Sequence, residues 1–374
     1  MIKRSSYCIY TILFFVLNFV NPIVGLTSSL QDGVNPDSLL SEVPHIFIED
    51  NSFKTIWVEA GIRREATDSK EGESTAARLL GFSPYAHFQY SQTEGYSQQS
   101  EFNDVKRFVA ISDIHGNDTT YRHFLRRHGV IDAKDNWVYG DGHLIVLGDI
   151  LDRGDAVTEA LWLTFKLEEQ ALRAGGKVHF LAGNHESMIL YNDVRYVNPK
   201  YFKIADIMGV EFKQWFGHRS ILGNWLRKRP IMITINDNLF VHAGISNAIL
   251  KNLYSKDEIN SAFRDQLFTM DSLMSIKDKR LDLLRFTDGP LWYRGYFKKD
   301  HNSLAEIDSA LQYYGTERII IGHTPGDRVR SLYQGKVIAI DSYLQRGDNG
   351  EVLLYDNGKF FRGFRDGSRL ELEN

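Results

Sequence analysis

Cysteine is almost missing from this chain of 374 residues, and neither sign of charge is in large excess. The only cysteine is Cys8, which lies in a segment that we expect to be removed. A processed chain would then have no disulfide, no thiolate metal site and no cysteine nucleophile. The formal net charge of -4 leaves no basic excess, so nucleic acid is not a favoured partner.

Long apolar runs are also scarce, and the clearest one lies near the start of the chain. Two basic residues precede the apolar run from Tyr7 to Val20, and an Asn-Pro pair and several small residues follow it. The run is shorter than the roughly 20 apolar residues of a membrane helix. The pattern predicts a signal peptide over residues 1–26 and a secreted or periplasmic protein without stable membrane insertion. An uncleaved membrane anchor formed by residues 7–26 is the alternative.

The segment that follows is predicted to contain little regular structure. Residues 27–104 are interpreted as a linker and an irregular N-terminal extension, because polar residues, glycine and proline interrupt every apolar pattern. Within it, residues 46–60 alternate well enough for one or two strands. Residues 63–101 are rich in Ser, Glu, Gln, Gly and Thr and are predicted to be a loop.

The catalytic domain is predicted over residues 105–374, where short apolar runs alternate with helical patterns. This alternation predicts a layered α/β fold with central β-sheets flanked by helices. Helices are expected over residues 117–128, 156–174, 186–228 and 256–285, and hairpin strands over 337–340, 351–355 and 359–364.

Five strand-like runs each lead, through a small residue or directly, to a side chain that can bind a metal. Because ligands gather outside the carboxyl ends of strands in open α/β sheets, we expect these side chains to meet. The runs cover residues 105–112, 144–147, 177–182, 231–241 and 318–321, and they deliver Asp113 with His115, then Asp149, Asn184, His242 and His323.

These six oxygen and imidazole donors are more than one tetrahedral site needs. They suit two adjacent divalent metal ions that share a carboxylate, with manganese expected and iron or zinc as alternatives. Such a pair clamps the attacking and leaving oxygens of an in-line displacement. It also lowers the pKa of a bridging water, which provides hydroxide near neutral pH.

The other charged residues of these segments suit phosphate-ester hydrolysis. Arg153 and Arg294 could bind phosphoryl oxygens in a bidentate manner. His185 follows Asn184 and could protonate a departing alkoxide, while Asp152 could orient that imidazole and raise its pKa.

At this point the motifs show a resemblance. The chain resembles the phosphoprotein phosphatase family of calcineurin-like metallophosphoesterases, and further stretches resemble its Shewanella-like phosphatase branch. The family motifs are Ser-Asp-Ile-His-Gly from Ser112, Gly-Asp-Ile-Leu-Asp-Arg-Gly from Gly148, Gly-Asn-His-Glu from Gly183, Val-His-Ala-Gly from Val241 and Gly-His-Thr-Pro from Gly322. The branch stretches cover residues 136–143, 193–197 and 289–296. Ser112 departs from the glycine usual in the family.

The resemblance implies a layered metallophosphoesterase fold, with a dimetal site at the carboxyl ends of the strands. It also implies a role for each matching residue. One metal would be held by Asp113, His115 and Asp149, and the other by Asp149, Asn184, His242 and His323. His185 with Asp152 would be the general acid, and Arg153 and Arg294 would bind phosphate. Arg195 and Tyr196 would shape the substrate pocket, unless Asp193 and Arg195 form only a structural ion pair on a helix.

The function implied is a metal-dependent phosphomonoesterase, most simply a protein Ser/Thr phosphatase, with phosphotyrosine as the other candidate substrate. A dinucleoside tetraphosphate hydrolase or another small-molecule phosphoesterase is the alternative, although the Asp152-Arg153 pair favours the phosphatase. A binding protein that had lost catalysis would lack some of these ligands, and all are present. The partner is therefore a phosphorylated protein or a small phosphate ester, and the sequence leaves the oligomeric state open.

Overall fold

A computed structural model describes residues 39–69, 74–93, 99–269, 279–299, 302–347 and 349–373. The predicted signal peptide and most of the predicted linker lie outside these residues. Residues 36–374 belong to one compact unit, so the extension and the catalytic body share it. Among the helices that the structure describes, none combines the length and apolar character needed to cross a membrane.

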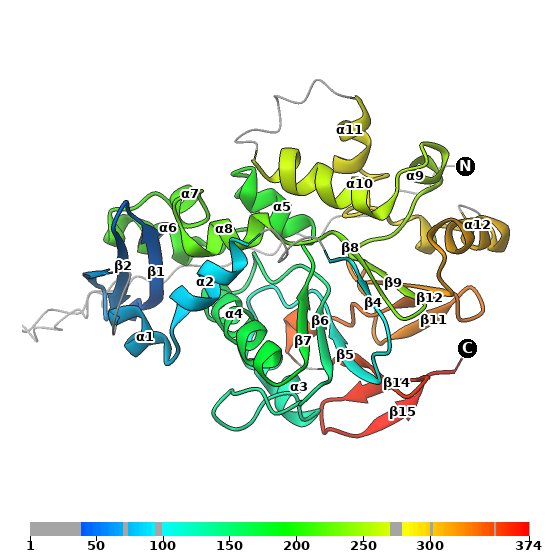
Figure 1. Cartoon of the computed structure of the whole chain (residues 1–374), viewed down its shortest axis with the longest axis horizontal. Helices are drawn as coiled ribbons and strands as arrows, with labels where there is room; N and C mark the ends of the chain where they lie inside the picture. Colours follow the sequence, from blue (N-terminus) through cyan, green and yellow to red (C-terminus); the bar gives the residue numbers. More distant parts are fainter. Residues whose placement is uncertain are drawn as a thin grey trace, which may run out of the picture. The chain divides into compact units, whose positions relative to one another are not determined.

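Two six-stranded mixed sheets form the centre of the unit (Figure 1). The first has the order β15-β14-β13-β5-β6-β7, and the second has the order β11-β12-β10-β9-β8-β4. The first comprises β5 (Arg107–Ile111), β6 (His143–Val146), β7 (Lys177–Phe180), β13 (Glu351–Asp356), β14 (Lys359–Phe364) and β15 (Arg369–Glu371). The second comprises β4 (Glu101–Phe102), β8 (Met232–Ile235), β9 (Asn238–Val241), β10 (Arg318–Ile321), β11 (Arg330–Leu332) and β12 (Val337–Ala339).

Each sheet combines a block of three parallel strands with antiparallel pairs; in the first sheet the parallel block lies at one edge, with β7 outermost. Strands β5, β6 and β7 run parallel to one another, as do β9, β10 and β12. The run predicted as one strand over residues 231–241 is instead an antiparallel pair, β8 and β9, joined by a turn at Asn236, whose φ is 50°. Both strands are apolar, so the sequence signals the change of chain direction only through the polar turn residues Asn236 and Asp237.

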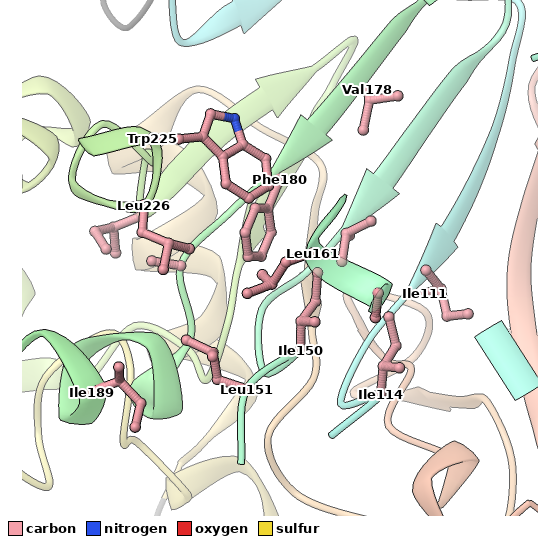
Figure 2. Close-up of a cluster of buried hydrophobic side chains, with 14 of the residues drawn as sticks. Ile111, Ile114, Ile150, Leu151, Leu161, Val178, Phe180, Ile189, Trp225 and Leu226 are labelled. Carbon is pink, nitrogen blue, oxygen red and sulfur yellow. The ribbon is translucent and has the colours of Figure 1, made fainter. Parts of the chain in front are cut away.

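Apolar residues alternate between the two faces of each sheet, and this alternation produces the layers. One buried cluster draws on inward residues of both sheets, including Phe108 and Phe240, whose ring centroids are 5.5 Å apart. The opposite face of the first sheet packs on helices α4 (Val157–Arg173), α5 (Asn184–Leu190) and α8 (Ile221–Arg227), where Phe180 lies beside Leu161 and Trp225 (Figure 2). The layered α/β prediction is therefore confirmed.

The helices lie largely where the sequence predicts them. They are α3 (Asp118–Arg127), α4 (Val157–Arg173), α5 (Asn184–Leu190), α6 (Pro199–Met208), α7 (Phe212–Trp215) and α8 (Ile221–Arg227), followed by α9 (Asn247–Lys251), α10 (Lys256–Ser261), α11 (Lys279–Arg285) and α12 (Leu304–Tyr314). A π-helical turn, η3 (Ala262–Gln266), and the 3-10 turns η4 (Leu267–Thr269), η6 (Gly295–Phe297) and η7 (Leu344–Arg346) complete the list.

The prediction of a loop over residues 63–101 is wrong for most of the described part. Strands β1 (Glu42–Ile48), β2 (Ser52–Glu59) and β3 (Ile62–Ser69) form an antiparallel sheet, and helices α1 (Thr75–Leu80) and α2 (Pro84–Ser91) follow it. Strand β3 is largely exposed and charged, so it lacks the apolar alternation that marks a strand. Its pairing with β2, from Ser52 with Ser69 to Glu59 with Ile62, is what makes it a strand.

A buried carboxylate attaches this extension to the catalytic body. Glu168 of α4 contacts His87 of α2 at 2.9 Å, accepts a hydrogen bond from the Trp225 indole of α8 at 2.8 Å, and pairs with the guanidinium of Arg229. Glu168 is 8% exposed and Arg229 is 4% exposed. Three segments that are distant in sequence therefore share one ion-pair network.

Replacing Glu168 with alanine should destabilise the chain by about 3–5 kcal/mol, because the Arg229 cation would stay buried without its carboxylate. The neighbouring Glu169→Ala substitution is the matched control. It removes an exposed ion pair with Arg173, which contributes about 0.3–0.5 kcal/mol. Denaturant unfolding of both variants measures the difference, and equal losses would show that the network carries no special share of the stability.

Candidate active site

The carboxyl ends of the central strands from both sheets meet at one place, and the predicted ligands lie there. Asp113 and His115 follow β5, Asp149 follows β6 and Asn184 begins α5 after β7. From the second sheet, His242 follows β9 and His323 follows β10. These six residues are all buried, with exposed fractions between 0% and 4%.

Three of the segments that carry these residues, those after β6, β7 and β9, approach one another too closely for a side chain at Gly148. A Cβ atom there would lie 2.6 Å from the backbone nitrogen of Gly183 and 2.7 Å from Nδ1 of His242. The φ of Gly148 is 85°, which also favours glycine. The glycine before Asp149 is thus a condition for bringing the first and second sheets together at the site.

Several site residues have left-handed backbone conformations, which non-glycine residues adopt only at a cost. Such conformations turn the chain sharply after a strand and aim the next side chain into the site. The φ angles are 54° for Asp113, 46° for His115, 59° for Asp149, 71° for Asp152, 68° for Arg153 and 63° for His323.

Asp149 lies at the centre of the donor set. Its Oδ2 is 3.3 Å from Nε2 of His242, 3.7 Å from Nε2 of His115 and 3.9 Å from Nε2 of His185. Two groups of potential metal ligands share it: Asp149 with His115 and His185, and Asp149 with His242 and His323. This arrangement agrees with a bridging carboxylate, although the first group contains His185 where the family resemblance implied Asp113.

The imidazole orientations suit metal binding through Nε2. Nδ1 of His115 lies 2.8 Å from the carbonyl oxygen of Leu151, and Nδ1 of His242 lies 2.7 Å from that of Leu147. A proton on Nδ1 that is donated to a carbonyl leaves Nε2 with its lone pair toward Asp149. Nε2 of His323 is buried and has no hydrogen-bond partner among the described residues. The donor set therefore fits divalent metal ions.

The charges of the site also indicate that a cation belongs there. Burial, with a contribution from Asp149, raises the pKa of Asp113 to about 6 against the opposing charge of His242. Burial also disfavours the His242 cation, but Asp149 outweighs it and raises the pKa of His242 to about 10. The protein alone thus balances its buried carboxylates with imidazolium, and bound divalent cations would replace those protons.

Glu186 organises the loop around Asp149 through the backbone. Its carboxylate accepts hydrogen bonds from the N–H groups of Asp149, Ile150, Leu151 and Gly183, at 2.8, 2.9, 3.1 and 2.7 Å. The side chain is completely buried. The last residue of the Gly-Asn-His-Glu motif therefore shapes the site without facing it.

His185 and Asp152 form the pair expected of a general acid. Nδ1 of His185 lies 2.6 Å from Oδ2 of Asp152, and both side chains are buried. Burial disfavours the imidazolium, yet Asp149 and Asp152 outweigh it and raise the pKa of His185. Arg153 places a guanidinium nitrogen 3.4 Å from Nε2 of the same imidazole. The geometry therefore sets the imidazole of His185 beside the guanidinium of Arg153.

Most of the predicted residues line one cavity of about 190 Å³. Arg294 lies in its wall and donates toward the hydroxyl of Thr324 at 3.4 Å. Tyr196 is also in the wall, with its ring centroid 5.3 Å from that of His185. Arg195 is not in the wall: it is 68% exposed and pairs with Asp193 in a turn, not on the predicted helix.

Four further residues in this wall, Pro325 among them, had no assigned role. Asp341 follows β12 and is 2% exposed, and the rule that strand ends carry ligands would have found it. Gln345 accepts a hydrogen bond from Arg153 at 2.9 Å. Trp292 faces His323 with ring centroids 6.0 Å apart. Trp292 belongs to the branch stretch 289–296 that supplied Arg294, so that stretch could have pointed to it, whereas Gln345 carries no sequence signal of this placement.

Ser112 has a larger part than the sequence suggested. Its hydroxyl donates to Oδ2 of Asp113, which also accepts the N–H of His323 at 2.9 Å. The serine that replaces the usual glycine therefore holds one oxygen of a predicted ligand.

The fold is that of a phosphoesterase, and the site contains two groups of potential metal ligands that share Asp149. A family model described as calcineurin-like phosphoesterase matches residues 106–327. The chain belongs to this family, as the motifs predicted, and it is an enzyme of the phosphoesterase class whose relatives use divalent metals.

Two of its curated relatives are named Shewanella-like protein phosphatases. Shewanella-like protein phosphatase 1 of Plasmodium berghei (strain Anka) is 28% identical over 265 residues, which cover 66% of this chain and 70% of the relative. Shewanella-like protein phosphatase 2 of Arabidopsis thaliana is 26% identical over 297 residues, or 67% and 74% of the two chains. The crystal structure of a cold-active protein-tyrosine phosphatase from a psychrophilic Shewanella species is 33% identical, with a TM-score of 0.81 and coverage of 89% of this chain and 100% of that one.

Changing His185 to alanine should have an effect that depends on the leaving group. With an alkyl phosphate, turnover should fall about 100-fold or more, because the departing alkoxide needs a proton. With nitrophenyl phosphate the loss should be about tenfold or less, because nitrophenolate departs without one. Steady-state kinetics on both substrates measure the ratio, and equal losses would contradict the role of His185 as general acid.

Changing Asp149 to asparagine should remove metal as well as activity, because both groups of potential ligands share this carboxylate. Metal content per chain, measured by elemental analysis after dialysis, should fall by at least half. Asp155→Asn is the control, since Asp155 is exposed and lies only a few residues away in the same loop. Full metal content in Asp149→Asn would show that the carboxylate does not bridge.

Proposed function

We propose that this chain is a metal-dependent protein phosphatase that hydrolyses phosphomonoesters by in-line attack. The observation that carries the proposal is the shared cavity: a donor set for divalent cations, the His185–Asp152 pair and two arginines all meet there. Relatives named protein phosphatases support the protein substrate.

Each predicted residue named below has a task in this proposal. Arg153 and Arg294 bind the equatorial phosphoryl oxygens and hold the phosphorus in line. His185 gives its proton to the leaving oxygen, and Asp152 keeps the imidazole oriented and protonated. Two divalent cations held by Asp113, His115, Asp149, Asn184, His242 and His323 would supply Lewis acidity and lower the pKa of the attacking water.

We propose phosphotyrosine as the preferred substrate. Two aromatic side chains, Tyr196 and Trp292, line the cavity on the sides of His185 and His323, and a phenyl ring could pack against either. The similar Shewanella structure is named a protein-tyrosine phosphatase, which supports this choice over phosphoserine and phosphothreonine.

Metal identity and location are part of the same proposal. Manganese suits a set of imidazole, carboxylate and amide donors without thiolate, and iron or zinc would fit similar geometry. Export from the cytoplasm rests on the basic and apolar pattern of residues 1–26, and it would place the substrate outside the cell or in the periplasm.

The test is phosphate release by the manganese-loaded chain from matched phosphotyrosine, phosphoserine and phosphothreonine peptides. Phosphotyrosine should give a kcat/KM at least about tenfold above the other two, because only its ring can pack on the cavity wall. Tyr196→Ala should reduce this ratio, whereas Tyr90→Ala, which changes an exposed tyrosine away from the cavity, should not. Cleavage of diadenosine tetraphosphate alone would contradict the proposal.

A further inference from the structure

A second cavity, of about 100 Å³, lies along β7, and all four residues of that strand line it. Its wall is formed by residues of α2, α4 and β7 and by the segment that follows α8. Lys177 at the start of β7 lies in its wall, whereas Asn184 and His185 follow the other end of the strand. The two cavities share no lining residue.

Positive charge predominates in the wall of this cavity. Lys177, Lys228 and Arg229 line it, together with a single carboxylate, Glu168. That carboxylate already accepts hydrogen bonds from Arg229 and the Trp225 indole and contacts His87. The wall therefore has more cations than the carboxylate can neutralise.

The two lysines have only neutral hydrogen-bond acceptors among the described residues. Nζ of Lys177 donates to the side-chain oxygen of Gln99 at 3.1 Å. Nζ of Lys228 donates to the carbonyl oxygen of Ser91 at 2.7 Å and to the side-chain oxygen of Gln92 at 3.0 Å. Each ammonium group has three N–H donors, so both lysines keep donors that a ligand in the cavity could use.

Burial makes this excess unfavourable. It lowers the pKa of Lys177, and burial together with the charge of Arg229 lowers the pKa of Lys228. His179, which is 5% exposed in the same wall, has its pKa held well below the usual value by burial and by His143 and Lys177. An anion in the cavity would reverse these penalties, since it would favour the charged lysines.

We propose that this cavity is a binding site for a small phosphate-type oxyanion, either inorganic phosphate or the phosphoryl group of a monoester. The cavity has room for a tetrahedral oxyanion, Lys177 and Lys228 would provide charge-assisted hydrogen bonds, and Arg229 would add positive charge. Phenyl-ring walls at Phe102 and Phe180 limit the space for water. This proposal concerns anion binding only, so it holds whether or not the chain is a protein phosphatase.

The test uses isothermal titration of the full chain with inorganic phosphate. Arg153→Ala and Arg294→Ala are introduced together, and metal is removed with a chelator, so that the active site no longer binds the anion. We expect about one phosphate per chain in this background. Adding Lys177→Met or Lys228→Met should weaken binding by about tenfold or more, the size expected for loss of a charge-assisted hydrogen bond. Circular dichroism of each variant checks folding.

Lys336→Met is the matched control, because this lysine is partly buried but pairs with Asp308 on the surface. It should leave phosphate affinity unchanged. Absence of binding in the Arg153→Ala, Arg294→Ala background would overturn the proposal, as would equal affinities in the Lys177→Met, Lys228→Met and Lys336→Met chains. A parallel titration with O-phosphoserine separates the two ligand sources: tighter binding identifies a monoester, and weaker binding identifies the free ion.

Discussion

The structure depends on keeping the carboxylate of Asp149 ionised while it is buried. Burial opposes its charge, but His242 and His185 outweigh burial and hold the pKa of Asp149 well below its usual value. Those imidazoles come from two different sheets, so the carboxylate stays ionised only when both sheets are in place. The charge of Asp149 therefore depends on the packing of the two sheets against each other.

The backbone of the loops at the site is held in place by residues that do not face the cavity. The Glu186 carboxylate is used entirely by N–H groups around Asp149, and Gly148 lets the loops after β6, β7 and β9 come within contact distance. Side chains that face the substrate are thus placed by others that do not. The same division holds for His185, whose orientation depends on the buried Asp152.

Motif spacing and strand patterns predicted the α/β layers, the strand ends that carry the ligands and the pairing of His185 with Asp152. A residue whose position follows from a short motif or from the end of a strand can be predicted from the sequence in this way. The strand β3 was missed because its charged face leaves no alternation, and only pairing with β2 orders it. Gln345 was missed because the path of its segment into the cavity follows from tertiary contacts that no local pattern encodes. Trp292 was missed although it lies in the same branch stretch, 289–296, as the predicted Arg294.

Six residues of the site have a left-handed backbone, and this feature has a consequence for the evolution of the protein. They are Asp113, His115, Asp149, Asp152, Arg153 and His323. Each such conformation costs of order 1 kcal/mol for a residue with a side chain, so six amount to roughly 6 kcal/mol, a large part of a typical folding free energy. Glycine at positions such as Arg153 would relieve that cost and abolish the chemistry. A lineage or a laboratory library selected for thermal resistance alone would therefore erode the active site first, and intact motifs record continued selection for activity.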